Sequence, residues 1–413
     1  MAKIREFDRT IPSTSLGIWY CKPVICSHKA FNIKEPDAQT PRFSYDPVEV
    51  LLGSIAIRDY SEKARIILAL RPDIKELDYL DFLLRILREV LKTQWKAPIP
   101  FQVMYVAERL TEYQLAAIRG AGIYAVNIDS LKTGTSDEAS FMRFVKTLSD
   151  RLREIFAQGP GYLVLYGSAE SLALVKRLWE PRIVARHAVF TSLPPYIEVT
   201  MPTAGDALKR LAMLFYGNLY ELIDADTLSQ VVLKAEENYT RALEVLANDP
   251  LLAFYSRQAI DDEEARPETA FTHYALKLAA IKHVIDIGID PSTLNVETIV
   301  ANVPIDIRIE RGWGSSIAIE IETLFGSGNP VTRLSTIIRE RLSLGYSVWI
   351  IVPPMQAFMY KPYIELLLNR FESRVEFYTL NASRLTLIPV MEYYEVLERV
   401  LEALRRQRVS ETK

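Results

Sequence analysis

The sequence predicts a multidomain protein of the α/β class, and three observations support this prediction. Residues 1–200 contain strands that alternate with helices, residues 201–262 have the spacing of helices only, and residues 263–413 return to a pattern of helices and strands. At 413 residues the chain is also longer than one hydrophobic core usually requires. We therefore expect an N-terminal α/β domain, a helical linker domain and a C-terminal α/β domain over these three ranges.

The N-terminal domain is predicted from apolar runs of strand length. Strands are expected at residues 64–72, 101–107, 123–129, 161–167 and 182–190, separated by helices at 79–91, 111–119, 141–156 and 168–179. No glycine-rich loop of the P-loop or dinucleotide-binding type follows these strands. Cys21 and Cys26, with His28 close by, are too few ligands for a zinc site, and we interpret them as reduced cysteines. The adjacent Pro194 and Pro195 are expected to break the regular structure and end the domain.

The remaining elements follow from periodicity and from helix end signals. Residues 203–262 carry apolar side chains three and four positions apart, as amphipathic helices do. Pro267 suits the first turn of the next helix, and Asn329 can cap a later one. The C-terminal domain is predicted as a helix from 267, strands at 294–300, 304–310 and 316–323, a helix at 330–344, a strand at 347–354, a helix at 363–371 and a strand at 374–380.

The hairpin at residues 304–323 is unusual because its polar positions are acidic. Isoleucines alternate with polar residues on both strands, which predicts one apolar and one acidic face. With residues 311–315 as the loop, an antiparallel register pairs Arg308 with Ala318 and sets Asp306 directly opposite Glu320, with Glu322 nearby. Facing like charges destabilise a sheet unless a cation compensates them, and a divalent metal ion with oxygen ligands is the usual solution.

Ordinary interpretations of the same residues stand beside this one. The acidic positions also fit a sheet with one solvent-exposed face, partly neutralised by Arg308 and Arg311. His273 and Lys277 share one helix face that could reach a phosphate, but such a pair is more often a solvated helix surface, which we expect here.

The order of elements in the C-terminal domain, with Asp306 on its second strand and the Glu320-x-Glu322 pattern on its third, resembles the PD-(D/E)xK superfamily of restriction-endonuclease-like nucleases. The resemblance covers residues 263–413 only. It implies metal-dependent hydrolysis of phosphodiester bonds, with Asp306 and Glu320 as metal ligands. Mg²⁺ or Mn²⁺ held there would activate a water molecule and stabilise the charge that develops on the phosphate.

The chain departs from the usual pattern of that superfamily at Glu322, where a lysine is common. Some restriction enzymes of the superfamily carry glutamate there, so Glu322 is expected to be a third metal ligand or the base that orients the water. Glu297 on the first strand could add a further carboxylate to the metal site. Arg333 in the following helix and Lys277 in the preceding one are candidates for the missing positive charge.

Composition and charge restrict the class of protein further. The formal net charge of -3 does not suggest a protein that coats nucleic acid, so contact would need a local basic surface. Arg333, Arg339, Arg341, Arg370 and Arg374 are candidates for it. No apolar run reaches membrane-spanning length and the N-terminus lacks the apolar core of a signal peptide, which predicts a cytoplasmic protein without a membrane partner. Scarce Gln, His and Cys beside plentiful Ile, Glu and Arg are typical of thermophilic proteins.

We therefore expect a cytoplasmic nuclease that depends on Mg²⁺ or Mn²⁺ and acts on nucleic acid, with DNA as the first candidate. The alternative is an inactive protein of nuclease-like fold that binds nucleic acid or a protein partner as a scaffold. The N-terminal domain could sense a small molecule, form a homodimer or bind a protein partner. It could also be a degenerate copy of the C-terminal fold, which a matching strand order would support.

Overall fold

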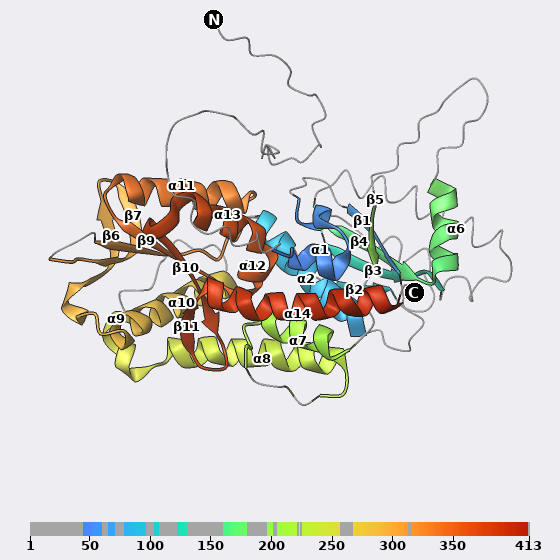
Figure 1. Cartoon of the computed structure of the whole chain (residues 1–413), viewed down its shortest axis with the longest axis horizontal. Helices are drawn as coiled ribbons and strands as arrows, with labels where there is room; N and C mark the ends of the chain where they lie inside the picture. The colour runs from blue at the N-terminus through green and yellow to red at the C-terminus, as the bar shows by residue number, and fades with distance from the viewer. Residues whose placement is uncertain are drawn as a thin grey trace, which may run out of the picture.

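The structure of the chain is a computed structural model. It describes residues 44–59, 65–70, 78–95, 103–106, 122–129, 160–179, 196–200, 205–220, 223, 225–256, 267–312 and 316–411. The predicted helices at 111–119 and 141–156, the predicted strand at 182–190, and Cys21, Cys26 and His28 lie outside these ranges. The described part contains two β-sheets with helices around and between them (Figure 1).

The first sheet is parallel and has the order β2-β3-β4-β1-β5. Its strands are β1 (Arg65–Leu70), β2 (Val103–Val106), β3 (Ile123–Asn127), β4 (Tyr162–Gly167) and β5 (Tyr196–Thr200). The first four confirm predicted strands. β5 was not predicted: it begins directly after Pro195 and pairs with β1. Only Val199 of β5 is buried, since this is an edge strand, and its sequence therefore carries little apolar signal.

The helices described within residues 44–256 confirm the predicted pattern, except for α1 (Pro47–Leu52) and the 3-10 helix that follows it, η1 (Ile55–Arg58), which were not predicted. The others are α2 (Asp78–Gln94), α6 (Ala169–Trp179), α7 (Asp206–Phe215), α8 (Leu228–Ala247) and α9 (Ala253–Ser256), with the short 3-10 helix η2 (Pro250–Leu252). Thr227 begins α8 by accepting a hydrogen bond from the backbone of Gln230. α8 packs against α2, α7 and α10 (Pro267–Asp286), so it connects the first half of the chain with the second.

The second sheet is mixed, and its six strands lie in sequence order, β11-β10-β9-β8-β7-β6. They are β6 (Leu294–Val300), β7 (Val303–Ile309), β8 (Ile317–Ile321), β9 (Ser347–Val352), β10 (Val375–Asn381) and β11 (Thr386–Pro389). The other helices are α11 (Pro330–Ser343), α12 (Pro354–Met359), α13 (Lys361–Phe371) and α14 (Val390–Glu411), with η3 (Pro291–Thr293) and η4 (Glu372–Arg374). The predicted order of helix, three strands, helix, strand, helix and strand is confirmed. α12, β11 and α14 were not predicted.

α10 and α11 cover opposite faces of the second sheet (Figure 1). α10 contacts β7, β8 and β11, whereas α11 contacts β9 and α13. β8 is buried from both sides, and it is therefore apolar or enclosed at every position.

The two sheets have different topologies. β1 lies between β4 and β5 in an all-parallel sheet, while the second sheet runs through its strands in order and contains antiparallel pairs. The hypothesis that the first sheet is a degenerate copy of the C-terminal fold is therefore wrong for the strands that the structure describes.

One large hydrophobic cluster includes residues of both sheets and of α2, α7, α8, α10 and α14. α14 contacts α1, α7 and β10, so the last helix packs against elements of all three predicted domains. The boundaries of those domains stay a prediction. In the part of the chain that the structure describes, no helix has both the length and the apolar character needed to cross a membrane.

Candidate active site

The acidic hairpin lies in the middle of the second sheet. The predicted pairing of Arg308 with Ala318 is confirmed, and β8 is held between β7 and β9. Glu320 is only 4% exposed and Glu322 only 7%. The interpretation of an ordinary sheet with a solvent-exposed acidic face is therefore wrong, because helices cover the positions that would face water.

Asp306 interrupts the pairing of β7 with β8. The regular pairing ends at Ile307 opposite Ile319, and the Asp306 carboxylate accepts a hydrogen bond of 2.7 Å from the backbone N–H of Ile321. The predicted backbone pair of Asp306 with Glu320 is therefore not formed. The predicted alternation of apolar and polar side chains on β7 also fails here. Ile305 packs in a small apolar cluster that is separate from the main core, whereas Ile307 belongs to the main core. The prediction that the isoleucines share a single apolar face is therefore wrong at this point.

Glu297 lies at the matching interruption on the other side of β7. β6 and β7 pair on both sides of it, from Val296 with Ile307 to Thr298 with Ile305, but not between Glu297 and Asp306. Glu297 has a backbone φ of 50°. This is a left-handed conformation that residues other than glycine adopt infrequently. The two carboxylates thus meet where regular pairing is broken.

Lys277 of α10 fills this break with a positive charge. Its side chain is completely buried; Nζ forms an ion pair with Glu297 and lies 3.3 Å from Asp306 Oδ1. His273, one turn earlier, has Nε2 3.5 Å from Asp306 Oδ2 and is 9% exposed. The expectation that His273 and Lys277 form a solvated helix face is therefore wrong, because this face of α10 packs on the sheet.

The surroundings of Asp306 favour its charged form. Burial by itself raises the pKa of this carboxyl group, but His273, Lys277 and the N–H of Ile321 outweigh that effect and lower it to about 2. Asp306 is therefore a fixed negative charge over the range in which most proteins function.

Glu320 is held by an arginine that the sequence suggested only as part of a basic rim. Arg341 of α11, 5% exposed, donates from Nε to Glu320 Oε1 at 2.6 Å and from Nη2 to the carbonyl of Pro304 at 2.7 Å. Burial and the charge of Asp306 nevertheless raise the pKa of Glu320 to about 8, although Arg341 acts in the opposite direction. No local spacing reveals this contact, because 21 residues separate its partners.

Glu322 follows β8 and meets the predicted Arg333. The Nη2 of Arg333 lies 3.3 Å from Glu322 Oε1, and the arginine side chain is 56% exposed. Burial raises the pKa of Glu322, Arg333 counteracts this, and the charge of Asp306 adds to the increase. Arg308, which was considered as a neutralising residue, instead pairs with Glu310.

The structure thus brings the sequence-predicted site residues into one electrostatic group. Asp306 affects the pKa of both Glu320 and Glu322, and Lys277 bonds both Asp306 and Glu297. The members are Glu297, Asp306, Glu320 and Glu322 as carboxylates, and Lys277, Arg333 and Arg341 as cations, with His273 beside them. We call this set the carboxylate cluster.

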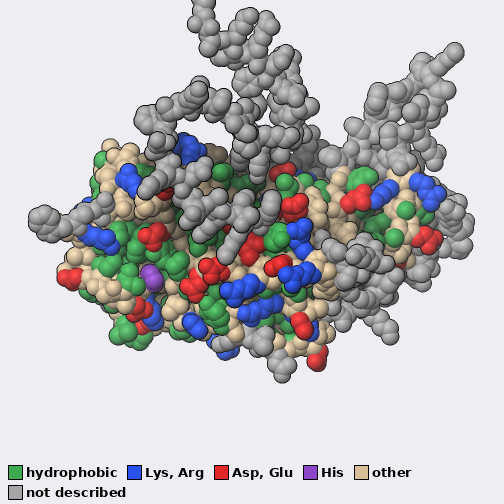
Figure 2. All heavy atoms as spheres, in the orientation of Figure 1, with side chains coloured by type: hydrophobic (Ala, Val, Ile, Leu, Met, Phe, Trp, Pro, Cys, Tyr) green, Lys and Arg blue, Asp and Glu red, His purple; other side chains and the backbone are tan. Residues whose placement is uncertain are grey.

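The other arginines of the predicted basic rim make no contact with the carboxylate cluster among the contacts of the described residues. They are Arg339, Arg370 and Arg374. Arg374 donates to the carbonyl of Tyr346 at 3.1 Å, and the guanidinium of Arg370 lies over the ring of Phe371. Arg339 lies on the exposed side of α11. On the face drawn in Figure 2, acidic and basic side chains are intermixed.

The donors of the carboxylate cluster match a hard divalent cation in chemistry, since all are carboxylate oxygens. As the side chains lie, the described residues contain no group of three or more His, Cys, Asp or Glu that could hold a metal ion. The reason lies in the ion pairs: Glu320 is turned to Arg341, Glu322 to Arg333 and Glu297 to Lys277. A metal ion would compete with these cations for the same oxygens.

No protein-family model matches this chain, and a search of the curated proteins found no match either.

Proposed function

We propose that this protein is a metal-dependent nuclease whose active site is the carboxylate cluster, with DNA as the first candidate substrate. The observation that carries the proposal is Lys277, a lysine without solvent exposure that contacts Asp306 and Glu297. A completely buried lysine among carboxylates is costly to maintain for stability alone, and perturbed charges of this kind gather at functional sites. It supplies the positive charge that is missing at the position of Glu322.

In this proposal Asp306, Glu320 and Glu322 hold Mg²⁺ or Mn²⁺, with Glu297 as a further ligand. The metal ion, when bound, would supply an activated water and stabilise charge on the phosphate. The low pKa of Asp306 keeps one ligand ionised at neutral pH. Lys277 stands beside Asp306 and can neutralise a phosphate or leaving oxygen, and the largely exposed Arg333 can contact the nucleic-acid backbone.

The test is a cleavage assay on single- and double-stranded DNA and RNA with Mg²⁺ or Mn²⁺, together with calorimetry of metal binding. Asp306→Asn is expected to abolish both cleavage and metal binding. Glu310→Gln is the matched control, because Glu310 follows the same strand but is exposed and pairs with Arg308. It should keep both. Cleavage retained by Asp306→Asn would end the proposal.

A second candidate function is a non-catalytic protein that binds nucleic acid or a partner. The buried pair of Glu320 with Arg341 and the pair of Glu322 with Arg333 favour it, because they already compensate two of the carboxylates without a metal. The same assay separates the two functions. Binding of nucleic acid without cleavage, and without metal binding by the unmodified protein, would support the second.

A further inference from the structure

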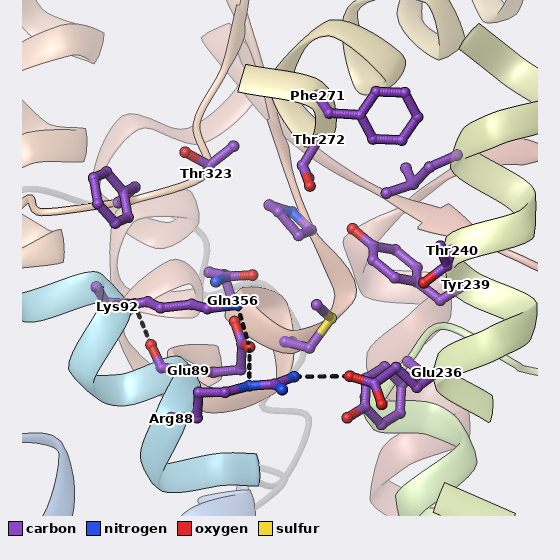
Figure 3. Close-up of a pocket in the computed structure, with 16 residues that line it drawn as sticks. Arg88, Glu89, Lys92, Glu236, Tyr239, Thr240, Phe271, Thr272, Thr323 and Gln356 are labelled. Atoms are coloured by element: carbon purple, nitrogen blue, oxygen red, sulfur yellow. Dashed lines mark hydrogen bonds and ion pairs between the residues drawn. The ribbon is translucent and has the colours of Figure 1, made fainter. Parts of the chain in front are cut away.

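A pocket of about 320 Å³ is lined in part by α10 and by the loop after β8 (Figure 3), two segments that also contribute residues to the carboxylate cluster. Its walls come from α2, α8, α10 and α12 and from the loop after β8. Its volume is near the lower limit of about 300 Å³ for small-ligand sites, which suits a ligand of the size of one nucleotide unit.

The pocket and the carboxylate cluster share two chain segments. Thr272 lines the pocket and immediately precedes His273, while Thr323 lines it and immediately follows Glu322. Figure 3 shows Thr272 and Thr323 in the upper part of the view, away from Arg88 and Glu236. A molecule in the pocket would therefore lie beside the site where the proposed function places the phosphate.

Aromatic side chains offer flat surfaces in this pocket. The side chain of Phe271 remains 37% exposed although it is large and apolar, and Tyr239 lies across from it on α8 (Figure 3). An exposed aromatic ring that lines a concave site, as Phe271 does, is a usual stacking partner of an unpaired base.

Gln356 and Tyr239 are among the lining residues that have a buried polar atom without a hydrogen-bond partner within the described part of the protein. Gln356 is 5% exposed and its Oε1 accepts no hydrogen bond; Tyr239 is also 5% exposed and its hydroxyl makes none. Figure 3 shows the Tyr239 hydroxyl directed to the interior of the pocket. Leaving such atoms unsatisfied is costly, so they favour a ligand with hydrogen-bonding edges.

The charges of the lining favour an uncharged ligand group. Arg88 and Lys92 are the cations, and Glu236 and Glu89 pair with them at 2.8 Å and 3.1 Å. Figure 3 shows these pairs at one end of the pocket, away from Phe271. The lining thus has balanced charge and suits a neutral planar ring better than a second phosphate.

We propose that this pocket takes one unpaired nucleobase of the nucleic-acid substrate, next to the phosphate at the carboxylate cluster. The base stacks on Phe271 and its edge bonds to Gln356 and Tyr239. The inference rests on the proposed nuclease function and specifies its substrate: a single strand, or a duplex from which one nucleotide has been extruded.

The test measures binding of a dye-labelled single-stranded oligonucleotide and of its duplex to the Asp306→Asn protein by fluorescence anisotropy. Added Phe271→Ala or Gln356→Leu should each weaken single-strand binding, Phe271→Ala by about 5- to 150-fold, which is the usual effect of losing one stacked aromatic. Phe254→Ala is the matched control, because Phe254 is 70% exposed on α9 and outside the pocket; it should leave binding unchanged. Circular dichroism verifies that each variant is folded.

A second readout locates the base directly. Single-stranded oligonucleotides that carry 2-aminopurine at successive positions should show quenching at one position with the Asp306→Asn protein, and this quenching should disappear with Phe271→Ala. If the unmodified protein cleaves nucleic acid but both pocket variants bind like Phe254→Ala, the pocket inference is overturned and the proposed function stands. If the protein neither binds nor cleaves nucleic acid, both are overturned.

Discussion

Replacing Lys277 with methionine tests how the carboxylate cluster is held together. Methionine keeps much of the apolar stem of lysine and removes the charge that contacts Asp306 and Glu297. Removing one member of a buried ion pair typically costs about 3–5 kcal/mol of unfolding free energy, because the remaining charge is left without compensation. The lowered pKa of Asp306, about 2 against 3.8, corresponds to about 2 kcal/mol as the net result of its partners and of burial, which opposes them.

The assay is urea unfolding at pH 7 and at pH 3, and α10 offers a matched control. Lys282→Met removes a lysine from the same helix that pairs at 3.0 Å with Asp249, but its side chain is 29% exposed. That change should cost less than about 1 kcal/mol. The double variant Lys277→Met with Asp306→Asn should recover part of the lost stability, because the neutral amide no longer needs the cation.

The pH dependence gives this prediction a definite sign. The pKa of Asp306 is lowered by folding, so its contribution is complete above pH 3.8 and is lost as the pH falls through about 2. The cost of Lys277→Met should therefore shrink from pH 7 to pH 3 and below. Equal costs for Lys277→Met and Lys282→Met at pH 7, or a cost that does not change on acidification, would refute the reasoning.

Two further predictions concern stability. The pKa of Glu320 is raised by folding from 4.5 to about 8, so the native state binds its proton more tightly and the unfolding free energy should fall as the pH rises between these values. Glu320→Gln should remove most of this slope in urea unfolding from pH 5 to pH 9; an unchanged slope would assign the pH dependence elsewhere. Gly217 has a φ of 75°, and a Cβ there would lie 2.6 Å from the carbonyl oxygen of Leu380 and 2.7 Å from Cγ of Pro354. A left-handed alanine by itself costs about 1–2 kcal/mol of unfolding free energy, and Gly217→Ala should cost clearly more. Gly345→Ala is the reference variant, because Gly345 has a φ of 91° and an added Cβ there would have no atom within 4 Å. Thermal unfolding of both variants measures the difference. Similar costs at both positions would contradict the steric argument.

Much of the second sheet could be predicted because its signals are local. The alternation of isoleucine with acidic residues, Pro267 at a first helical turn and Asn329 as a cap are all read within a few neighbouring positions. Asp306, Glu320 and Glu322 were identified in this way, whereas Lys277 and Arg333 were candidates only because of the resemblance to a nuclease superfamily; the five residues do lie together.

The missed elements are those whose sequences carry little periodic signal. β5 is an exposed edge strand with one buried residue, and β11 is only four residues long. Both become strands because a neighbouring strand, β1 or β10, offers them a pairing edge.

By itself, the sequence determined which acidic residues occupy consecutive strands and in what order helices and strands follow, because both depend on spacing along the chain. Only the tertiary structure decided that Asp306 breaks the strand pairing, that Lys277 is buried against it, and that Arg341 reaches Glu320 from the other side of the sheet. The physical reason is that these are contacts between elements: α10 and α11 must first pack on opposite faces of the second sheet before their cations can compensate the same group of carboxylates.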